Sequence, residues 1–238
     1  GETNLIKITS AYAMLVNGGK KITPTFIDKI QDRNGRTIFR QDIRPCLECR
    51  SADQSLNEVP VIPDYREQIA DRASAYQMVR MLEGVVKRGT GRRIASLNKP
   101  LAGKTGTTNK NFDTWFIGFS PDLACGVYVG FDDPKTLGQR DTGSNVAAPI
   151  FKRFMKIALK GMPEVPFRAP PGILHVRINT ETGSLARPGD KNIITEVFKP
   201  GSVPTGVSRI VDGGYAAGWM SRKRVRSWKR SLDLRGTK

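Results

Sequence analysis

Three short, strand-like segments follow one another closely in the middle of this 238-residue chain. They span residues 101–107, 115–119 and 125–131, and Ser120-Pro121-Asp122 supplies the turn between the second and the third. The short connections favour an antiparallel meander, because parallel strands need a long crossover. The middle segment is almost wholly apolar, as expected of a central strand covered on both faces. The sequence therefore predicts a small antiparallel sheet with residues 115–119 at its centre.

Helices are predicted before and after this sheet. Asp71 can cap a helix that ends at Gly89, and its apolar residues recur at helical spacing in a stripe of Ala75, Val79, Leu82 and Val86, broadened by Met78 and Val85. A second helix is expected over residues 146–159, with an apolar stripe of Ile150, Phe154, Ile157 and Ala158. A shorter helix over residues 8–16 ends at Asn17-Gly18-Gly19. This order indicates an α+β fold in which helices cover an antiparallel sheet.

The remaining segments are more polar. Residues 22–30 are expected to be extended, and Asn34-Gly35 predicts a hairpin with residues 37–39. Residues 40–64 are predicted to form a surface loop, and Pro and Gly residues after Pro163 mark a linker. Two further strands, 173–179 and 193–198, are expected around Thr182-Gly183. We therefore predict a main portion at 1–162, a linker with a small β element at 163–204, and a basic, disordered tail at 205–238.

The chain is strongly basic, with a formal net charge of +17. Residues 221–238 alone hold eight Lys or Arg residues and one Asp. Such a charge favours anionic partners, among them nucleic acid, acidic lipid and anionic polymers. No nucleic-acid-binding motif accompanies the charge, so we expect no nucleic acid partner and interpret the last residues as a solvated tail.

The cysteines are sparse. Cys46 and Cys49 form a C-x-x-C pair, and Cys125 lies in an apolar run; together with His175 they make a conceivable Cys₃His zinc set. The three parts are far apart in sequence and Cys125 has the setting of a buried strand residue, so we expect no metal site and no cofactor. A disulfide between Cys46 and Cys49 stays open for an exported chain, whereas a redox role is not expected.

The segment Ala102–Asn109, Ala-Gly-Lys-Thr-Gly-Thr-Thr-Asn, is the most informative chemically. On an exposed strand edge, Lys104 offers a fixed positive charge, and Thr105 and Thr107 offer hydroxyls that can hold a substrate carboxylate. Gly106 has no side chain, so a substrate backbone can lie against the strand. The backbone N–H of Thr107 can point at a developing oxyanion, a kind of donor worth ~3 kcal/mol. Taken alone, the Lys-Thr-Gly triplet also fits a buried strand whose lysine reaches solvent.

Its neighbours make the triplet specific. The motifs in order are Arg88-Gly89-Thr90-Gly91, Ala102–Asn109, Trp115–Asp122, Gly130–Pro134 and Ala147–Phe151, preceded by Ser10–Gly19. From about Leu5 to Met162 the chain resembles the C-terminal half of the transpeptidase domain of class A penicillin-binding proteins, most closely the 1A type. Residues 170–173 and 186–190 resemble the tail that follows this domain in some members.

The resemblance implies part of the fold shared by penicillin-binding proteins and β-lactamases. It also implies formation of peptidoglycan cross-links. In the family, a serine attacks the penultimate D-alanine carbonyl of a stem peptide, and the acyl group passes to an amine of a neighbouring stem; β-lactams acylate the same serine. Lys104 then belongs to the catalytic charge network, and the substrate-binding residues are Thr105, Gly106, Thr107 and Thr108. Segments 88–91 and 109–113 would support this site.

The nucleophile of the family is the serine of a Ser-x-x-Lys motif at the start of a helix, followed by a Ser-x-Asn motif. Ser96-Leu97-Asn98-Lys99 satisfies both patterns formally, but Pro100 disfavours a helical Lys99. Ser55-Leu56-Asn57 falls in the predicted loop. We therefore expect both motifs to precede this chain, and the chain to be a fragment that acylates nothing alone.

The implied partners are peptidoglycan stem peptides or their lipid-linked precursor, β-lactams, and the upstream part of the same protein. The implied location is the periplasmic face of the bacterial inner membrane. Two alternatives remain open. One is a β-lactamase-type hydrolase, which the segment after Met162 and the pattern of residues 115–122 disfavour. The other is a non-catalytic protein whose basic tail holds a wall polymer or a membrane.

Overall fold

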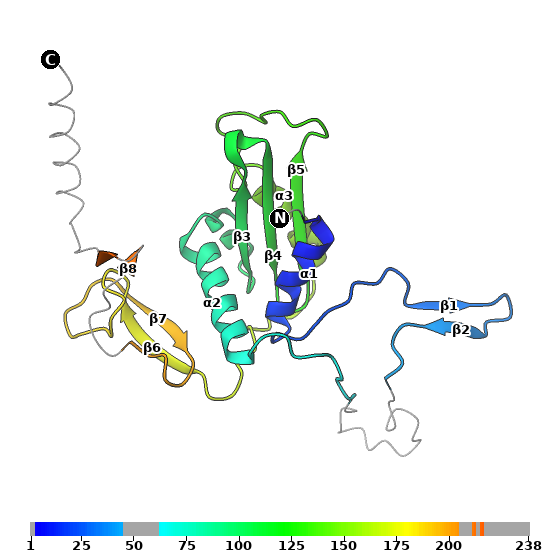
Figure 1. Cartoon of the computed structure of the whole chain (residues 1–238), viewed down its shortest axis with the longest axis horizontal. Helices are drawn as coiled ribbons and strands as arrows, with labels where there is room; N and C mark the ends of the chain where they lie inside the picture. The colour runs from blue at the N-terminus through cyan, green and yellow to red at the C-terminus, as the bar shows by residue number, and fades with distance from the viewer. Residues whose placement is uncertain (1–2, 45–61, 205–210, 213–214, 217–238) are drawn as a thin grey trace. The chain divides into compact units, whose positions relative to one another are not determined.

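The structure, a computed structural model, describes residues 3–44, 62–204, 211–212 and 215–216 (Figure 1). The chain divides into two compact units, residues 1–173 and 174–238, and each is considered by itself. The domain boundaries proposed from the sequence stay predictions. The Cys46–Cys49 pair, the Ser55-Leu56-Asn57 segment and nearly all of the basic tail lie outside the described residues.

The predicted antiparallel meander is confirmed. Strands β3 (Ala102–Thr107), β4 (Asp113–Phe119) and β5 (Ala124–Gly130) form a sheet in the order β3-β4-β5. The register places Phe116 of β4 opposite Thr105 on one side and Val127 on the other. β4 is therefore the central strand, as its apolar sequence predicts.

Both faces of β4 are buried, and the two faces carry different aromatic rings. Phe116 and Phe119 have no exposed surface, and they point to opposite faces because side chains alternate along a strand. Phe116 packs against Phe151, with ring centroids 4.7 Å apart. Phe119 meets Tyr12 edge-on at 6.4 Å and clusters with Val79. The sheet is thus held between two separate hydrophobic clusters.

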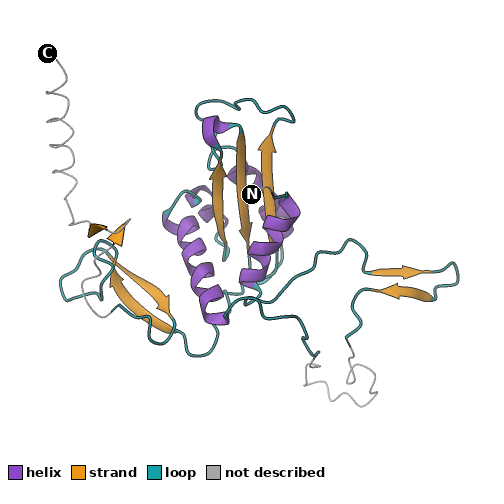
Figure 2. Ribbon diagram, viewed as in Figure 1, coloured by secondary structure: helices purple, strands orange, loops and turns teal. Residues whose placement is uncertain are grey.

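One of these clusters is closed by helices α1 (Leu5–Val16) and α2 (Arg72–Arg88), which lie side by side on one face (Figure 2). α1 begins one turn earlier than predicted, because the Asn4 side chain accepts a 2.9 Å hydrogen bond from the backbone N–H of Lys7. Asp71 caps α2 as predicted, accepting from the N–H of Ser74 at 2.9 Å. The predicted core stripe of α2 is buried, as shown by Ala75, Val79, Leu82 and Val86. Met78 does not belong to it, since 43% of its surface is exposed.

The second cluster is closed by α3 (Ala147–Ala158), and here the predicted apolar stripe is wrong. The buried residues of this helix are Ala147, Ala148, Phe151 and Met155. The expected stripe faces outward instead: 48% of Ile150, 48% of Phe154 and 71% of Ile157 are exposed. α3 is apolar over much of its circumference, so helical periodicity alone does not decide which apolar stripe is buried. Packing against Phe116 selects the one that contains Phe151.

The remaining elements are short. β1 (Lys29–Gln31) pairs with β2 (Thr37–Arg40), so the predicted hairpin is present, although the expected extended run over 22–30 is a strand only from Lys29. In the second unit, β6 (Leu174–Asn179) pairs antiparallel with β7 (Ile193–Phe198), as predicted. Two-residue strands β8 (Val211–Asp212) and β9 (Tyr215–Ala216) also pair. The described part of the first unit also holds two short 3-10 helices, η2 (Arg92–Leu97) and η3 (Asn109–Asn111).

The burial of α3 predicts opposite outcomes for two phenylalanines three residues apart. Phe151→Ala should lower the free energy of unfolding by about 3–5 kcal/mol, because it empties a fully buried ring site against Phe116. Phe154→Ala removes the same atoms from a half-exposed position and should cost below about 1 kcal/mol. Urea unfolding followed by circular dichroism measures both. Equal losses of unfolding free energy in the two variants would mean that Phe154 is as buried as Phe151.

Candidate active-site strand

The Lys-Thr-Gly segment lies on β3, at one edge of the sheet. Among the described strands only β4 pairs with β3, so the other side of β3 presents backbone N–H and C=O groups that no strand satisfies. Thr105 and Thr107 share one face of the strand, and Lys104 and Gly106 share the other. Lys104 and Thr107 are exposed. The structure therefore brings the predicted site residues to an accessible strand edge.

The two threonine hydroxyls are held by neighbouring loops. Thr105 Oγ1 lies 2.8 Å from Thr90 Oγ1, and either hydroxyl can donate. Thr107 Oγ1 accepts a 3.0 Å hydrogen bond from the backbone N–H of Gly143. The Ser144 hydroxyl in turn donates to the Thr90 carbonyl at 2.9 Å, which joins the two loops. Because Thr107 accepts from Gly143, its own proton is free to be donated to an incoming anion.

The contact between Gly143 and β3 requires a residue without a side chain. A Cβ atom at position 143 would lie 2.5 Å from the carbonyl oxygens of both Gly106 and Trp115. Separations below 3.0 Å from backbone atoms cannot be relieved by a rotamer change, so the loop would have to lift away. The loop residues 142–145 and the strand pair β3–β4 therefore form one packed unit.

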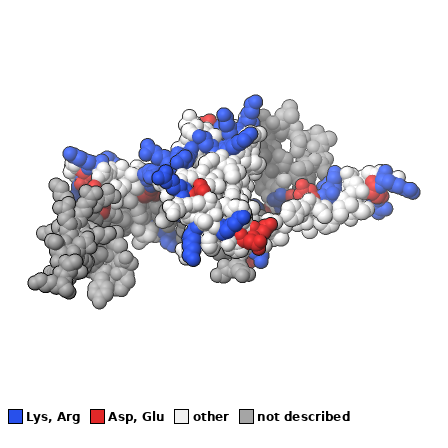
Figure 3. Space-filling model, turned by 90° about the horizontal axis from the view of Figure 1, so that it is seen from above, with Lys and Arg blue, Asp and Glu red and all other residues white. Residues whose placement is uncertain are grey.

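Lys104 places a positive charge beside the Thr105 hydroxyl. Its ammonium donates to the Thr105 carbonyl oxygen at 2.9 Å and lies 3.5 Å from Thr105 Oγ1. No acidic side chain in the described part of the chain forms an ion pair with it. Lys and Arg side chains also predominate over Asp and Glu on the face seen in Figure 3. The charge of Lys104 is thus available to attract an anionic group.

Thr108 differs from the other two threonines. Its hydroxyl accepts from the backbone N–H of Asp113 at 2.8 Å and lies 3.3 Å from the Asp113 carboxylate. The turn that it closes also rests on Asn111, whose Nδ2 donates to the Gly138 carbonyl at 2.9 Å. Thr108 therefore fixes the loop at the end of β3, where segment 109–113 was expected to lie.

The formal Ser-x-x-Lys match at Ser96 does not form a nucleophile–base pair. Ser96 is exposed near the end of η2, and Asn98 adopts a left-handed backbone conformation with φ of 51°. Lys99 turns toward the end of α3, where it donates to the Met162 carbonyl at 3.1 Å and lies 3.2 Å from the Glu164 carboxylate. The lysine is thus occupied in a structural contact.

The described residues contain no group of three His, Cys, Asp or Glu side chains arranged to hold a metal ion. Cys125 is a free, half-buried thiol on β5, and burial raises its pKa. His175 lies on β6, in the other unit.

Sequence reasoning missed Gly143 and Ser144 as parts of this site. The run Thr-Gly-Ser-Asn at 142–145 has the composition of a loop, and that signal was visible. Nothing in the sequence tied the loop to Thr107, which lies 36 residues earlier.

Comparison with known proteins shows the family to which this chain belongs. Residues 2–156 match the penicillin-binding protein transpeptidase domain, so the chain belongs to the penicillin-binding protein transpeptidase family. The crystal structure of penicillin-binding protein 1A from Haemophilus influenzae is similar, with a TM-score of 0.70 and 30% identity over 87% of this chain and 33% of that one.

Within the family, several matches are to the 1A type. Residues 169–212 match the penicillin-binding protein 1A C-terminal domain. Penicillin-binding protein 1A of Rickettsia conorii is 44% identical over 85% of this chain, and that of Pseudomonas aeruginosa is 36% identical over 88%. The chain spans only 25% and 29% of the lengths of these two relatives. It therefore carries the C-terminal part of a 1A-type transpeptidase domain, together with the segment that follows it.

The close approach of Gly143 to β3 gives a second prediction. Gly143→Ala should lower the free energy of unfolding by about 1–3 kcal/mol, because its Cβ overpacks against two backbone carbonyls. Gly84→Ala is the matched control, since its Cβ meets only the flexible end of Arg88 within helix α2. Helix propensity then favours alanine there by up to about 1 kcal/mol. Thermal unfolding of both variants measures the two changes in stability. If both variants gained stability, or both lost it, the packing of Gly143 against β3 would be contradicted.

Proposed function

We propose that this chain supplies the substrate-carboxylate side of a serine D,D-transpeptidase site that cross-links peptidoglycan stem peptides. The observation that carries the proposal is the exposed edge of β3, where the Lys104 ammonium lies beside the Thr105 hydroxyl and Thr107 is exposed two residues further along the strand. A stem peptide that ends in D-alanine carries a carboxylate at the position where these groups can hold it. Penicillins present a carboxylate in the same relation to their reactive carbonyl.

Each residue has a role in this proposal. The Thr105 and Thr107 hydroxyls donate to the substrate carboxylate, and Lys104 stabilises its charge. The backbone N–H of Thr107 donates to the oxyanion that forms when the scissile carbonyl becomes tetrahedral. Gly106 leaves room for the substrate backbone along the strand edge, and Thr108 keeps the adjoining turn in place.

The attacking serine is placed outside these 238 residues. Ser96 is the start of the only Ser-x-x-Lys sequence in the chain, and its lysine is bound to the end of α3. In the proposed reaction, the serine oxygen bonds to the penultimate D-alanine carbonyl carbon, the C–N bond breaks, and the terminal D-alanine leaves with the proton that the serine hydroxyl gives up. The amine nitrogen of a second stem peptide then bonds to the same carbon, the C–O bond to the serine breaks, and a proton from the amine returns to the serine oxygen. The 238 residues alone would carry out neither step.

The proposed setting follows from the same reaction. Stem peptides or their lipid-linked precursor are the expected substrates, at the periplasmic face of the bacterial inner membrane, and β-lactams are the expected inhibitors. None of the helices in the described ranges is both long enough and apolar enough to cross a membrane.

A chimaera tests the role of Thr107. This chain would replace the corresponding segment of the Rickettsia conorii relative, and acylation by a fluorescent penicillin would be timed on denaturing gels. Thr107→Val should slow acylation by roughly 10- to 100-fold, because it removes one hydrogen bond to a charged carboxylate. Thr195→Val, at an exposed position on strand β7, is the matched control and should leave the rate unchanged.

The same assay includes the 238-residue chain by itself. We expect no covalent label on it. Label that disappears in the variant Ser96→Ala would place the nucleophile within the chain and overturn this part of the proposal. Label released with turnover by the chimaera would favour a hydrolase instead.

A further inference from the structure

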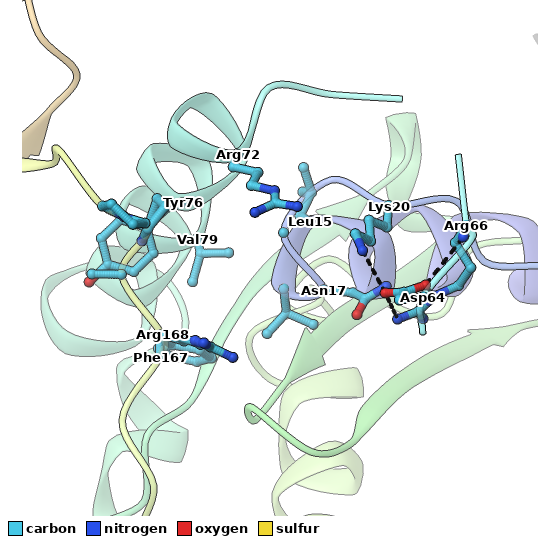
Figure 4. Close-up of a pocket in the computed structure, with 15 residues that line it drawn as sticks. Leu15, Asn17, Lys20, Asp64, Arg66, Arg72, Tyr76, Val79, Phe167 and Arg168 are labelled. Carbon is cyan, nitrogen blue, oxygen red and sulfur yellow. Dashed lines mark hydrogen bonds and ion pairs between the residues drawn. The ribbon is translucent and has the colours of Figure 1, made fainter. Parts of the chain in front are cut away.

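The first unit also has a pocket whose lining includes no residue of β3. It has a volume of ≈ 490 Å³ and lies where the end of α1, the beginning of α2 and the segment 167–171 meet (Figure 4). Volumes of this size are typical of sites for small molecules or for a few side chains of a partner.

One part of this pocket is apolar. Leu15 and Val16 come from α1, Val79 and Tyr76 from α2, and Phe167 from the segment that passes below them. Phe167 is fixed by the core, since its ring meets Phe119 edge-on at 5.7 Å. The pocket can therefore accept an apolar group without distortion of the sheet.

The charged side chains that line the pocket are mostly cationic. Lys20, Arg66, Arg72 and Arg168 face a single acidic residue, Asp64, which leaves an excess of three positive charges. Arg66 and Lys20 both bind that carboxylate, at 2.8 Å and 2.6 Å, and they hold the pKa of Asp64 far below its usual range. The carboxylate therefore stays ionised, and it neutralises only one of its two partners.

Two arginines point into the open space from opposite walls. Figure 4 shows the guanidinium of Arg72, from the first turn of α2, and that of Arg168, from the segment 167–171, directed toward the centre. Arg72 makes one long hydrogen bond, 3.4 Å to Gln68. Arg168 makes no hydrogen bond or ion pair with any residue in the described ranges. Two such groups across an apolar floor can bind a carboxylate with paired N–H donors.

Hydrogen bonds fix the backbone between Gly18-Gly19 and residues 68–70, at one side of the pocket. The backbone N–H groups of Ile69 and Ala70 both donate to the Gly19 carbonyl, at 2.9 Å and 3.1 Å. Gly19 has φ of +79°, and a Cβ there would lie 2.3 Å from the Ala70 carbonyl oxygen. Gln68 adds a 2.6 Å hydrogen bond from its side chain to the Gly18 carbonyl. This part of the backbone therefore loses little entropy when a ligand binds.

We propose that this pocket binds an acidic peptide segment of a partner protein, with a carboxylate between Arg72 and Arg168 and a neighbouring apolar side chain on the floor formed by Leu15, Val79 and Phe167. A small inorganic anion would leave that floor uncovered. The site is independent of the transpeptidase proposal, since it shares no residue with β3.

Nuclear magnetic resonance of the ¹⁵N-labelled 238-residue chain tests this inference. The probe is acetyl-Phe-Glu-amide, compared with acetyl-Phe-Gln-amide and acetyl-Ala-Glu-amide. The first peptide should shift the side-chain Nε–H signals of Arg72 and Arg168 saturably, with one peptide per chain. Each of the other two should bind at least tenfold more weakly, because each lacks one half of the recognised chemistry. Binding should also weaken as salt is raised.

Matched variants locate the binding. Arg168→Gln should weaken the Phe-Glu peptide by roughly tenfold, and the rest of the spectrum should stay unchanged. Arg153→Gln, an exposed change of the same charge on α3, should have no effect. Equal binding of the Glu and Gln peptides, or no shift at millimolar peptide, would overturn the proposal. So would shifts of Arg168 that appear only with phosphatidylglycerol vesicles, since these would assign the pocket to a lipid.

Discussion

The burial of β4 on both faces is the constraint on which the rest of the first unit depends. Phe116 and Phe119 are fully buried, and each belongs to a different cluster. The first brings α3 to one face of the sheet, and the second brings α1 and α2 to the other. β3 and β5 are then positioned by their hydrogen bonds to the same central strand. The strand that carries the Lys-Thr-Gly segment is therefore oriented by a core that it contributes to only through Ala102.

The site on β3 combines this rigid strand with two loops that reach it from distant parts of the chain. Thr90 and Gly143 each engage one of the strand's threonine hydroxyls, and Ser144 links the two loops to each other. These contacts hold the Thr105 and Thr107 side chains in place on the strand. The other edge of β3 carries backbone N–H and C=O groups that no described strand binds. The geometry thus fits the transpeptidase family to which the chain belongs.

The pocket between α1, α2 and residues 167–171 also depends on this core. The ring of Phe119, on the central strand, packs edge-on against Phe167 in the pocket lining, so β4 contributes to both regions. The chemistry of the two regions nevertheless differs. β3 offers hydroxyls and one ammonium on a strand edge, whereas the pocket offers guanidinium groups above an apolar floor.

The sequence by itself determined the three strands of the central sheet, the Asp71 cap of α2 and the side chains that the Lys-Thr-Gly segment presents. These depend on local signals: apolar runs bounded by turns, Asp71 before a helical stripe, and a lysine and threonines on one short strand. Only the tertiary structure decided which stripe of α3 is buried, because Ile150 and Phe151 are equally apolar and the packing surface of Phe116 selects between them. It also decided the contact between Thr107 and Gly143 and the assembly of Arg72 with Arg168. Those residues are far apart in the chain, and the spatial order of packed elements, which no local pattern encodes, brings them together.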